Sequence, residues 1–496
     1  MKRGWLTSLF LLLVAGSSQA EQVPSGPSVD DIFLWLAGGI SSARIQRLTG
    51  TADGNRALSC RVTPPCVRAL QKAGADATLI QGLTGQNVSH QKGQIPKSAA
   101  STPCGCSGAA AGVATLVHAR NFKDAESRVR ALLRDDPKNA SLLFVLGTIL
   151  KQQERFDEAL DAFSESLRLR PDFVETHTQL SYLFYRNNDS DYALSEARTA
   201  LSMDTQNAEA YRYLGLAHYA DGHYEAALNA YEKSLQLEPE NADVYFDIGI
   251  TQRDKGDLRR AASAYRHALS LRPDFWQAHS NLGVVLREQG KLDEAIAEYR
   301  TAIRLKPEEA SIRNNLGNTF CDREEFDKAI IEFKELYRQT PDWEGGHNCL
   351  ARAYMSKRDY PAAIRELQSA IAVNPDGAAE HRVLGQALLL TGRDQEAVAA
   401  LRKAVSLNPK SALAHHFLGT ALVNTQAVAE AEGEFREALR LEPNAQNHYS
   451  LAACLMALNR FEEALGELEI ASRLDPHENL YRARMQEAAR MIGTTK

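Results

Sequence analysis

Apolar residues recur at three- and four-residue intervals along most of the chain, and polar residues fill the positions between them. This spacing is typical of helices that bury one face. In residues 276–305 the bulky members of the pattern are Leu282, Leu286, Leu292, Ile296, Tyr299 and Ile303. Gly290 separates the two halves of this stretch, and glycine takes the left-handed conformation at a helix end without steric cost. The pattern predicts pairs of amphipathic helices joined by short turns.

The helix pairs repeat with a fixed period of 34 residues. The clearest marker is a proline, which ends the second helix of each pair because its ring clashes with a continuing helix. The marker occurs at Pro137, Pro171, Pro239, Pro273, Pro307, Pro341, Pro375, Pro409 and Pro443, with Thr205 at one expected place and Pro476 one residue early. A fixed period of this length indicates a repeat array.

Two small residues also mark each repeat. An alanine stands 12 residues before each proline position, at Ala125, Ala159, Ala193, Ala227, Ala261, Ala295, Ala329, Ala363, Ala397, Ala431 and Ala464. A second small residue precedes it by a further 12 positions, at Gly147, Ser181, Gly215, Gly249, Gly283, Gly317, Ala351, Gly385, Gly419 and Ala452, whereas the first unit has Val113. Antiparallel helices cross closely only where side chains are small, so we expect these residues to form the crossing contact.

This combination of residues resembles the tetratricopeptide repeat. The resemblance is carried by Asn281-Leu282-Gly283, Gly290, Asp293-Glu294-Ala295, Tyr299, Ala302 and Pro307. It extends over eleven units, at 106–139, 140–173, 174–207, 208–241, 242–275, 276–309, 310–343, 344–377, 378–411, 412–444 and 445–478. The resemblance implies an all-α fold, a right-handed superhelical solenoid of about eleven helix-turn-helix units, preceded by a small helical N-terminal domain.

The first twenty residues have the pattern of an export signal. Lys2 and Arg3 precede a short apolar core, and Ser18-Gln19-Ala20 forms a cleavage site of small residues. The core is too short to span a membrane comfortably. We therefore predict a signal peptide over residues 1–20 and an exported protein, periplasmic or secreted. The alternative is a buried N-terminal helix.

Residues 28–86 contain an internal duplication. Gly39 and Ile45 recur 35 residues later as Gly74 and Ile80, and Leu48-Thr49-Gly50 recurs as Leu83-Thr84-Gly85. Each copy predicts a helix, a glycine turn and a second helix, over 31–37 and 41–48 and again over 66–72 and 76–83. We expect a small helical domain with a docking or capping role.

The remaining boundaries follow from composition. Residues 87–111 are rich in Ser, Ala, Gly, Gln and Lys without helical spacing, which predicts a flexible linker. The tetratricopeptide solenoid is expected over 112–478. Residues 479–492 predict a capping helix with Leu480, Met485 and Ala488 on one side, because a solenoid must cover its last apolar face.

Charge and motif content narrow the classes of function. Without Lys2 and Arg3 the chain has 63 acidic and 55 basic residues and a net charge of -8, which argues against nucleic acid as the main partner. No apolar run in the repeats is long enough to span a membrane. The chain has no serine-nucleophile elbow, zinc-protease motif, phosphate loop or dinucleotide fingerprint. The sequence therefore predicts a protein that is not an enzyme and needs no cofactor.

The seven cysteines form two groups. We interpret Cys321, Cys349 and Cys454, which lie inside repeat helices, as small core or groove residues. Four others lie outside the array and are disulfide candidates in an oxidising compartment: Cys60, Cys66, Cys104 and Cys106. Free thiols and a metal site are the alternatives, although intervals of five residues and one fit a metal poorly. Cys60–Cys66 is the first pairing to expect.

Six histidines occupy the fourth position of their repeats: His177, His279, His347, His381, His415 and His448. Metal ligands must converge within a few ångströms, whereas equivalent positions of neighbouring repeats lie about a helix-packing distance apart. We therefore interpret these histidines as half-buried packing residues, and we predict no metal site.

The resemblance to tetratricopeptide repeats implies that ligands bind on the inner, concave face of the first helices. The residues that would line this groove are Tyr185, Arg212, Tyr219, Arg253, Asn281, Arg287, Asn314, Asn315, Asn318, Asn348 and Arg352. Asparagine amides can both donate to and accept from a peptide backbone, and arginines can bind carboxylates. The alternative is that these polar residues only line a solvated groove.

Asp247, Asn281 and Asn315 are similar to part of the asparagine ladder in the repeat arm of O-linked N-acetylglucosamine transferases. The ladder breaks at Cys349, Val383 and Phe417, and the transferase's catalytic domain is missing. Our hypothesis is an exported scaffold that binds a peptide segment or partner helix in the concave groove. Two alternatives remain: a structural or assembly component that acts through its convex face or self-association, and a non-catalytic targeting subunit of a glycosyltransferase-type enzyme.

Overall fold

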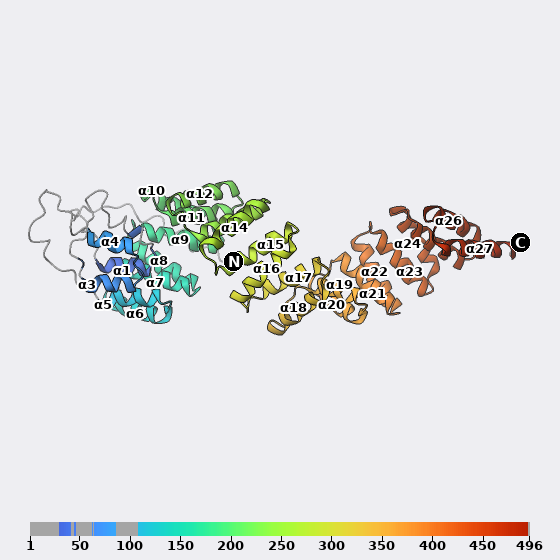
Figure 1. Ribbon diagram of the computed structural model, residues 1–496, viewed down its shortest axis with the longest axis horizontal. Coiled ribbons are helices and arrows are strands. Elements are labelled where there is room, and N and C mark those ends of the chain that lie inside the picture. Colours follow the sequence, from blue (N-terminus) through green and yellow to red (C-terminus); the bar gives the residue numbers. More distant parts are fainter. Residues whose placement is uncertain (1–28, 41–43, 46–61, 63, 86–107, 495–496) are drawn as a thin grey trace, which may run out of the picture. The chain divides into compact units, whose positions relative to one another are not determined.

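A computed structural model describes residues 29–40, 44–45, 62, 64–85 and 108–494, and these residues form helices and no strand. The chain divides into two compact units, Met1–Asp247 and Ile248–Lys496. Each unit is built from antiparallel helix pairs stacked in sequence order (Figure 1). The described part of the chain contains eleven such pairs, which confirms the predicted all-helical solenoid.

In its described residues, the first unit contains three N-terminal helices and four complete repeat pairs. The N-terminal helices are α1 (Val29–Ala37), α3 (Pro64–Lys72) and α4 (Ala77–Gly85). The first helices of the pairs are α5 (Gly108–His118), α7 (Ala140–Gln152), α9 (Val174–Arg186) and α11 (Ala208–Ala220). The second helices are α6 (Phe122–Asp135), α8 (Phe156–Leu169), α10 (Ser190–Met203) and α12 (Tyr224–Leu237). The division between the units falls inside α13 (Ala242–Asp254).

The second unit continues with the same alternation. Its first helices are α15 (Trp276–Glu288), α17 (Ala310–Asp322), α19 (His347–Ser356), α21 (Ala378–Leu390), α23 (Ala412–Asn424) and α25 (Ala445–Ala457). Its second helices are α14 (Leu258–Leu271), α16 (Leu292–Leu305), α18 (Phe326–Gln339), α20 (Tyr360–Val373), α22 (Asp394–Leu407), α24 (Val428–Leu441) and α26 (Phe461–Leu474). A final helix, α27 (Asn479–Thr494), packs on α26.

The small residues lie at the helix crossings, as the period predicts. The alanine of each second helix is fully buried, and Ser181 Oγ donates a 2.8 Å hydrogen bond to the carbonyl of Ala193 across one crossing. All of these crossing glycines except Gly385, which faces Leu401, also contact an aromatic ring that we did not predict. A Cβ added to Gly283 would lie 2.7 Å from the ring of Tyr299, and one added to Gly317 would lie 2.7 Å from Phe333. The glycine therefore accommodates a bulky ring from the second helix.

One first helix is shorter than the others. Helix α19 begins only at His347, whereas the other first helices of the second unit begin at the first position of their repeats. Gly346 has a φ of 91°, a left-handed conformation that favours glycine. The Tyr337 hydroxyl donates a 2.8 Å hydrogen bond to the carbonyl of Gly345. The first three residues of this repeat, 344–346, are therefore not helical.

The N-terminal helices pack onto the first repeats. Helix α1 contacts both α5 and α7 (Figure 1), and buried apolar residues from Ile32 to Leu183 form one hydrophobic cluster. Arg44 Nη2 lies 3.0 Å from Glu175 Oε1, and its Nη1 also pairs with Asp204. The helices predicted over 31–37, 66–72 and 76–83 overlap α1, α3 and α4. The predicted signal peptide and most of the predicted helix over 41–48 and linker lie outside the described residues.

The C-terminal helix differs in detail from the expectation. Ala488 is fully buried, but Leu480 is exposed and the neighbouring Tyr481 is buried in its place. The boundaries of the predicted domains remain a prediction. No helix in the described part of the chain has the length and hydropathy needed to cross a membrane.

Candidate functional site

In the first unit, a network of polar side chains connects consecutive first helices on the predicted groove positions. Lys151 donates to the Gln179 side-chain oxygen, and Gln179 Nε2 donates a 3.1 Å hydrogen bond to Glu209. The Tyr213 hydroxyl also donates to Glu209, at 2.7 Å. Lys151 Nζ lies 5.1 Å from the ring centre of Tyr182, and burial lowers the pKa of this lysine. The side chains thus satisfy one another across three repeats.

Of the predicted groove residues of this unit, Arg212 and Tyr185 adjoin this network through Tyr213 and Tyr182, and Tyr219 has a separate contact. Arg212 Nε donates a 2.6 Å hydrogen bond to Asp247, which is 5% exposed. Burial raises the pKa of Asp247, and the nearby Arg212 guanidinium opposes that shift. Tyr185 lies with its ring centre 6.4 Å from that of Tyr182. Tyr219 contacts Tyr224, with ring centres 6.0 Å apart.

The groove positions nearest the N-terminus are covered by the chain itself. Ser141 and Glu175 occupy the second position of their repeats and are 6% and 7% exposed. Ser141 Oγ lies 3.4 Å from Asp31 Oδ1 of α1, and Glu175 pairs with Arg44. In a repeat of the second unit, Leu413 at the same position is 52% exposed. The inner face of the repeats over 140–207 is therefore partly occupied.

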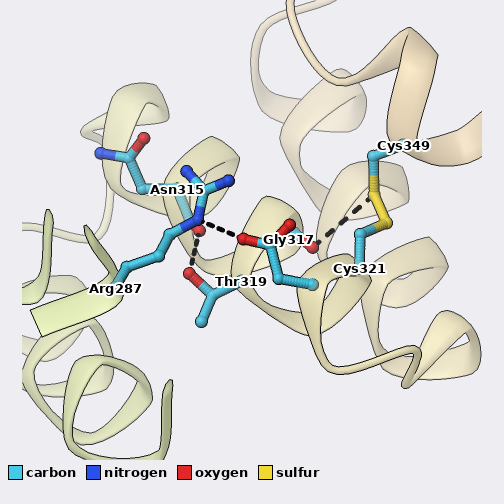
Figure 2. Close-up of a disulfide and its surroundings, with 7 residues drawn as sticks. Arg287, Asn315, Gly317, Thr319, Cys321 and Cys349 are labelled. Atoms are coloured by element: carbon cyan, nitrogen blue, oxygen red, sulfur yellow. Dashed lines mark hydrogen bonds and ion pairs between the residues drawn. A yellow bond between two sulfur atoms is a disulfide. The ribbon is translucent and has the colours of Figure 1, made fainter. Parts of the chain in front are cut away.

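In the second unit, three asparagines predicted for the groove have unpaired side chains within the described residues. The side-chain amides of Asn281, Asn315 and Asn318 are half-buried and form no hydrogen bond with the described part of the chain. The backbone carbonyl of Asn315 accepts from Thr319 Oγ1 at 2.7 Å, so the helix holds the residue while its amide stays available (Figure 2). These three amides therefore remain available for hydrogen bonds to a ligand.

Of the arginines predicted for the groove in this unit, two pair with a carboxylate and one is unpaired within the described residues. Arg253 donates two hydrogen bonds to Asp254, at 3.0 and 2.9 Å. Arg287 reaches from α15 to Asp322 of α17, with Nε 2.6 Å from Oδ2 (Figure 2). Arg352 is exposed and has no ion pair within the described residues. Arg287 therefore links two first helices and Arg253 pairs within its own helix, whereas Arg352 can contact a ligand.

Two further asparagines take different roles. Asn348 Nδ2 donates a 2.7 Å hydrogen bond to Glu380 of the next repeat. Asn314 Oδ1 is buried and has no hydrogen bond among the described residues. The Trp343 Nε1 beside it is also buried and has no acceptor among the described residues, and both atoms would lie within 3.0 Å of a Cβ added to Gly345. Of these residues, only the exposed Asn348 presents its side chain at the surface.

The structure corrects our interpretation of two cysteines. Cys321 and Cys349, which we expected to be core or groove residues, form a disulfide with Cα atoms 5.9 Å apart. Figure 2 shows that this bond joins α17 to α19, so position 12 of one first helix faces position 6 of the next. The sequence separation of 28 residues could have suggested the pairing, but reading each cysteine within its own helix concealed it. Cys454 is buried and free.

The four disulfide candidates outside the repeats are only partly described. Cys66 is disulfide-bonded, and its partner lies outside the described residues. Cys60, Cys104 and Cys106 themselves lie outside them, so the expected Cys60–Cys66 pairing remains a prediction.

The histidines at the fourth position link the two helices of their repeats. In five of them Nδ1 lies 2.5–2.7 Å from a glutamate oxygen 19 residues later: His177, His279, His347, His415 and His448. Three of these also place Nε2 3.1 Å from the proline carbonyl of the preceding repeat. These contacts give the histidines a structural role. No cluster of His, Cys, Asp and Glu in the described ranges could hold a metal ion.

Two family comparisons match the repeats. Residues 115–172, 286–342, 350–412 and 418–479 match the tetratricopeptide repeat family. Residues 192–313 match the tetratricopeptide domain of cytochrome c-type biogenesis protein H. A comparison with curated protein sequences found no match.

Several solved structures resemble parts of the chain. MamA is 26% identical and aligns over 34% of this chain and 97% of its own length, with a TM-score of 0.29. YrrB, described as a tetratricopeptide protein with an unusual peptide-binding site, is 23% identical over 40% of this chain and 99% of its own, with a TM-score of 0.32. PilF of Pseudomonas aeruginosa is 20% identical over 46% and 98%, with a TM-score of 0.37. The likeness to the transferase arm remains a hypothesis.

Proposed function

This chain is a tetratricopeptide repeat protein, and we propose that it is an exported scaffold that binds an extended peptide segment on the inner face of α15, α17 and α19. Proteins of this family generally mediate protein–protein interactions. The observation that carries the proposal is the set of half-buried amides of Asn281, Asn315 and Asn318, which have no hydrogen bond within the described chain.

These amides suit the backbone of an extended segment. Each amide offers an N–H donor and a carbonyl acceptor, so together they can pair with peptide groups spaced along the segment irrespective of its sequence. Because the amides stand on helices rather than loops, their positions are fixed before the ligand arrives, which reduces the entropy lost on binding. Neighbouring arginines are already neutralised by Asp254 and Asp322, so the backbone of the ligand matters more here than its charge.

The exposed Arg352 adds one preference. It lies on α19 beyond the amides and has no ion pair in the described part of the chain. A carboxylate on the ligand would meet a guanidinium that no protein carboxylate already holds. We therefore favour a segment with an acidic residue toward the end bound near α19.

Export is supported by the cysteines as well as by the N-terminal sequence. The Cys321–Cys349 bond and the disulfide at Cys66 fit an oxidising compartment, where such bonds persist. The residues of the predicted signal peptide have the charge, apolar core and cleavage site that export requires. We propose a periplasmic or secreted protein.

Two other functions remain as alternatives to groove binding. A structural component would use the second-helix face or associate with itself, and a targeting subunit would bring an enzyme to its substrate. The first alternative predicts a mass that depends on concentration. The second predicts that an enzyme co-purifies with the chain. Neither requires the asparagine amides.

The test is a capture experiment from the native envelope or extracellular fraction with the mature chain. The groove variant is Asn281→Ala with Asn315→Ala and Asn318→Ala, which removes the open amides and leaves the Arg287–Asp322 pair intact. The matched control is Arg259→Ala with Lys334→Ala, two exposed residues of second helices with no ion pair in the described residues. Partners retained by the control and lost by the groove variant support the proposal; equal recovery by all three proteins rejects it.

A further inference from the structure

One histidine departs from the His–Glu pattern of the repeats. His381 is at the fourth position of its repeat, but the residue 19 positions later is Ala400 rather than glutamate. Two other repeats with alanine at this later position have tyrosine at the fourth, as in Tyr211 with Ala230. The repeat over 378–411 therefore differs from the other repeats with a fourth-position histidine, because it has no carboxylate opposite that histidine.

The ring of His381 nevertheless has the orientation of its counterparts. Its Nε2 lies 3.1 Å from the carbonyl of Pro375, as the Nε2 of His279 does from Pro273. A carbonyl only accepts hydrogen bonds, so Nε2 has the proton and Nδ1 presents a lone pair. That Nδ1 atom is buried and has no hydrogen-bonding partner within the described chain. The counterpart atom of His279 is 2.6 Å from Glu298.

A pocket of about 420 Å³ lies beside this histidine, among α20, α21 and α22. Ile371, Leu384, Leu388 and Ala400 give it an apolar lining, and the exposed Lys403 lies at the same pocket. Glu396 also lines it, but this carboxylate is already bound by Arg393, at 2.8 and 2.7 Å. Lys403 is the basic residue that lines this pocket, and it forms no short ion pair among the described residues. Its Nζ atom lies 3.6 Å from the carboxylate of Asp376.

We propose that this pocket binds the carboxyl group of a ligand with a short apolar body, and that the carboxyl group occupies the place of the missing glutamate. The five complete repeats show how a carboxylate oxygen is held at 2.5–2.7 Å from the same ring nitrogen. In the bound state a hydrogen bond joins His381 Nδ1 to the carboxyl oxygen of the ligand, with one proton between them. His381 Nε2 continues to donate its own proton to the carbonyl of Pro375. Lys403 adds positive charge at the opening, and Ile371 and Leu384 contact the apolar part.

The ligand reaches Nδ1 only if the side chains around it adjust, because that atom has no contact with solvent. Gln368 and Lys403 are long, exposed side chains that line the pocket and can change rotamer at low cost. The ligand is either a free small acid or an acidic side chain of another protein. Both have a carboxyl group on an apolar body.

The experiment measures histidine ring nitrogens by ¹⁵N NMR in the full mature chain, with the His381 signals assigned through His381→Gln. The probes are butyrate, butyramide, and an end-blocked alanine peptide with one central glutamate. We expect a saturable shift of His381 Nδ1 with butyrate or the peptide and none with butyramide. A response to butyrate alone assigns a small acid, and a response to the peptide assigns an acidic protein segment.

The matched variant is Ala400→Glu, which supplies the missing carboxylate from within the repeat. We expect its His381 signals to resemble those of His279 without any probe and to show no response to butyrate. Three results would overturn the proposal: no response of the wild-type protein to either carboxylate, an equal response to butyramide, or an unchanged response in Ala400→Glu. The site is independent of the inner groove, so this test and the capture experiment can fail separately.

Discussion

At the scale of single residues, the fourth-position histidines illustrate what a repeat period can and cannot predict. Their half-buried location follows from the period, and no metal ligation was expected. The partner glutamate 19 residues later was not predicted, because the contact depends on side-chain rotamers across the helix pair. Arg313 makes the equivalent contact with Glu332 at 3.1 Å, so a residue other than histidine can pair with the glutamate from this position.

The His279–Glu298 pair predicts a pH dependence of stability. The hydrogen bond with Glu298 raises the pKa of His279, and burial opposes this shift only in part. A histidine whose pKa is higher in the folded than in the unfolded protein stabilises the fold. This stabilisation is complete below the pKa of the unfolded state, about 6.5, and is lost as the pH rises through the pKa of the folded state. We expect the difference in urea midpoint between the wild type and His279→Gln to be larger at about pH 6 than at about pH 9. A difference that grows with pH would contradict this account.

The crossing glycines predict a packing effect. In Gly283→Ala the new methyl group would lie 2.7 Å from the Tyr299 ring, so the ring must move. Overpacking of this kind lowers the free energy of unfolding by about 1–3 kcal/mol. The higher helix propensity of alanine over glycine offsets up to about 1 kcal/mol of this loss. We expect a lower thermal midpoint by circular dichroism. Gly433→Ala in α24 is the control, because its Cβ meets nothing within 4 Å and should leave the midpoint equal or higher.

At the scale of elements, the helix pairs could be predicted because each repeat encodes them locally. The turn glycines Gly222, Gly256, Gly290 and Gly392 all have positive φ, as the sequence predicts. Links between successive first helices could not be predicted in the same way. Arg212 with Asp247 and Arg287 with Asp322 each span 35 residues and vary from repeat to repeat, so no period identifies them. The period therefore places the predicted groove residues at equivalent positions of the first helices, but it does not indicate which of them are already paired.

The disulfide between α17 and α19 predicts a redox-dependent stability. A bond that closes a separation of 28 residues stabilises by about 3–4 kcal/mol in the chain-entropy account. We expect reductant, or Cys321→Ser with Cys349→Ser, to lower the thermal midpoint and to increase amide hydrogen exchange in α19. Cys454→Ser is the control, because burial raises the pKa of the Cys454 thiol to about 11 and keeps it out of thiol chemistry. Equal effects of reductant on the wild type and the double variant would contradict the prediction.

At the scale of the molecule, the repeats differ in how much of their inner face is free. In the first unit, α1 and Arg44 occupy the second-position residues of α7 and α9. In the second unit, the asparagine amides of α15 and α17 and the second-position Leu413 of α23 stay open within the described chain. Repeats of the same fold therefore offer different surfaces. Contacts of Asp31 and Arg44 with the second-position residues account for this difference in the first unit.

The ion pair at Arg44 provides the test of this covering. Its side chain is 6% exposed and that of Glu175 is 9% exposed, so removing the arginine leaves a buried carboxylate without this partner. Breaking a buried pair in this way costs about 3–5 kcal/mol. We expect Arg44→Met to increase amide hydrogen exchange in α7 and α9 and to leave α21, α23 and α25 unchanged. The control is Arg198→Met, an exposed residue of α10 without an ion pair in the described residues. If both variants exchange alike, the N-terminal segment does not stabilise the inner face, and the groove of the first repeats must be counted as open to ligands.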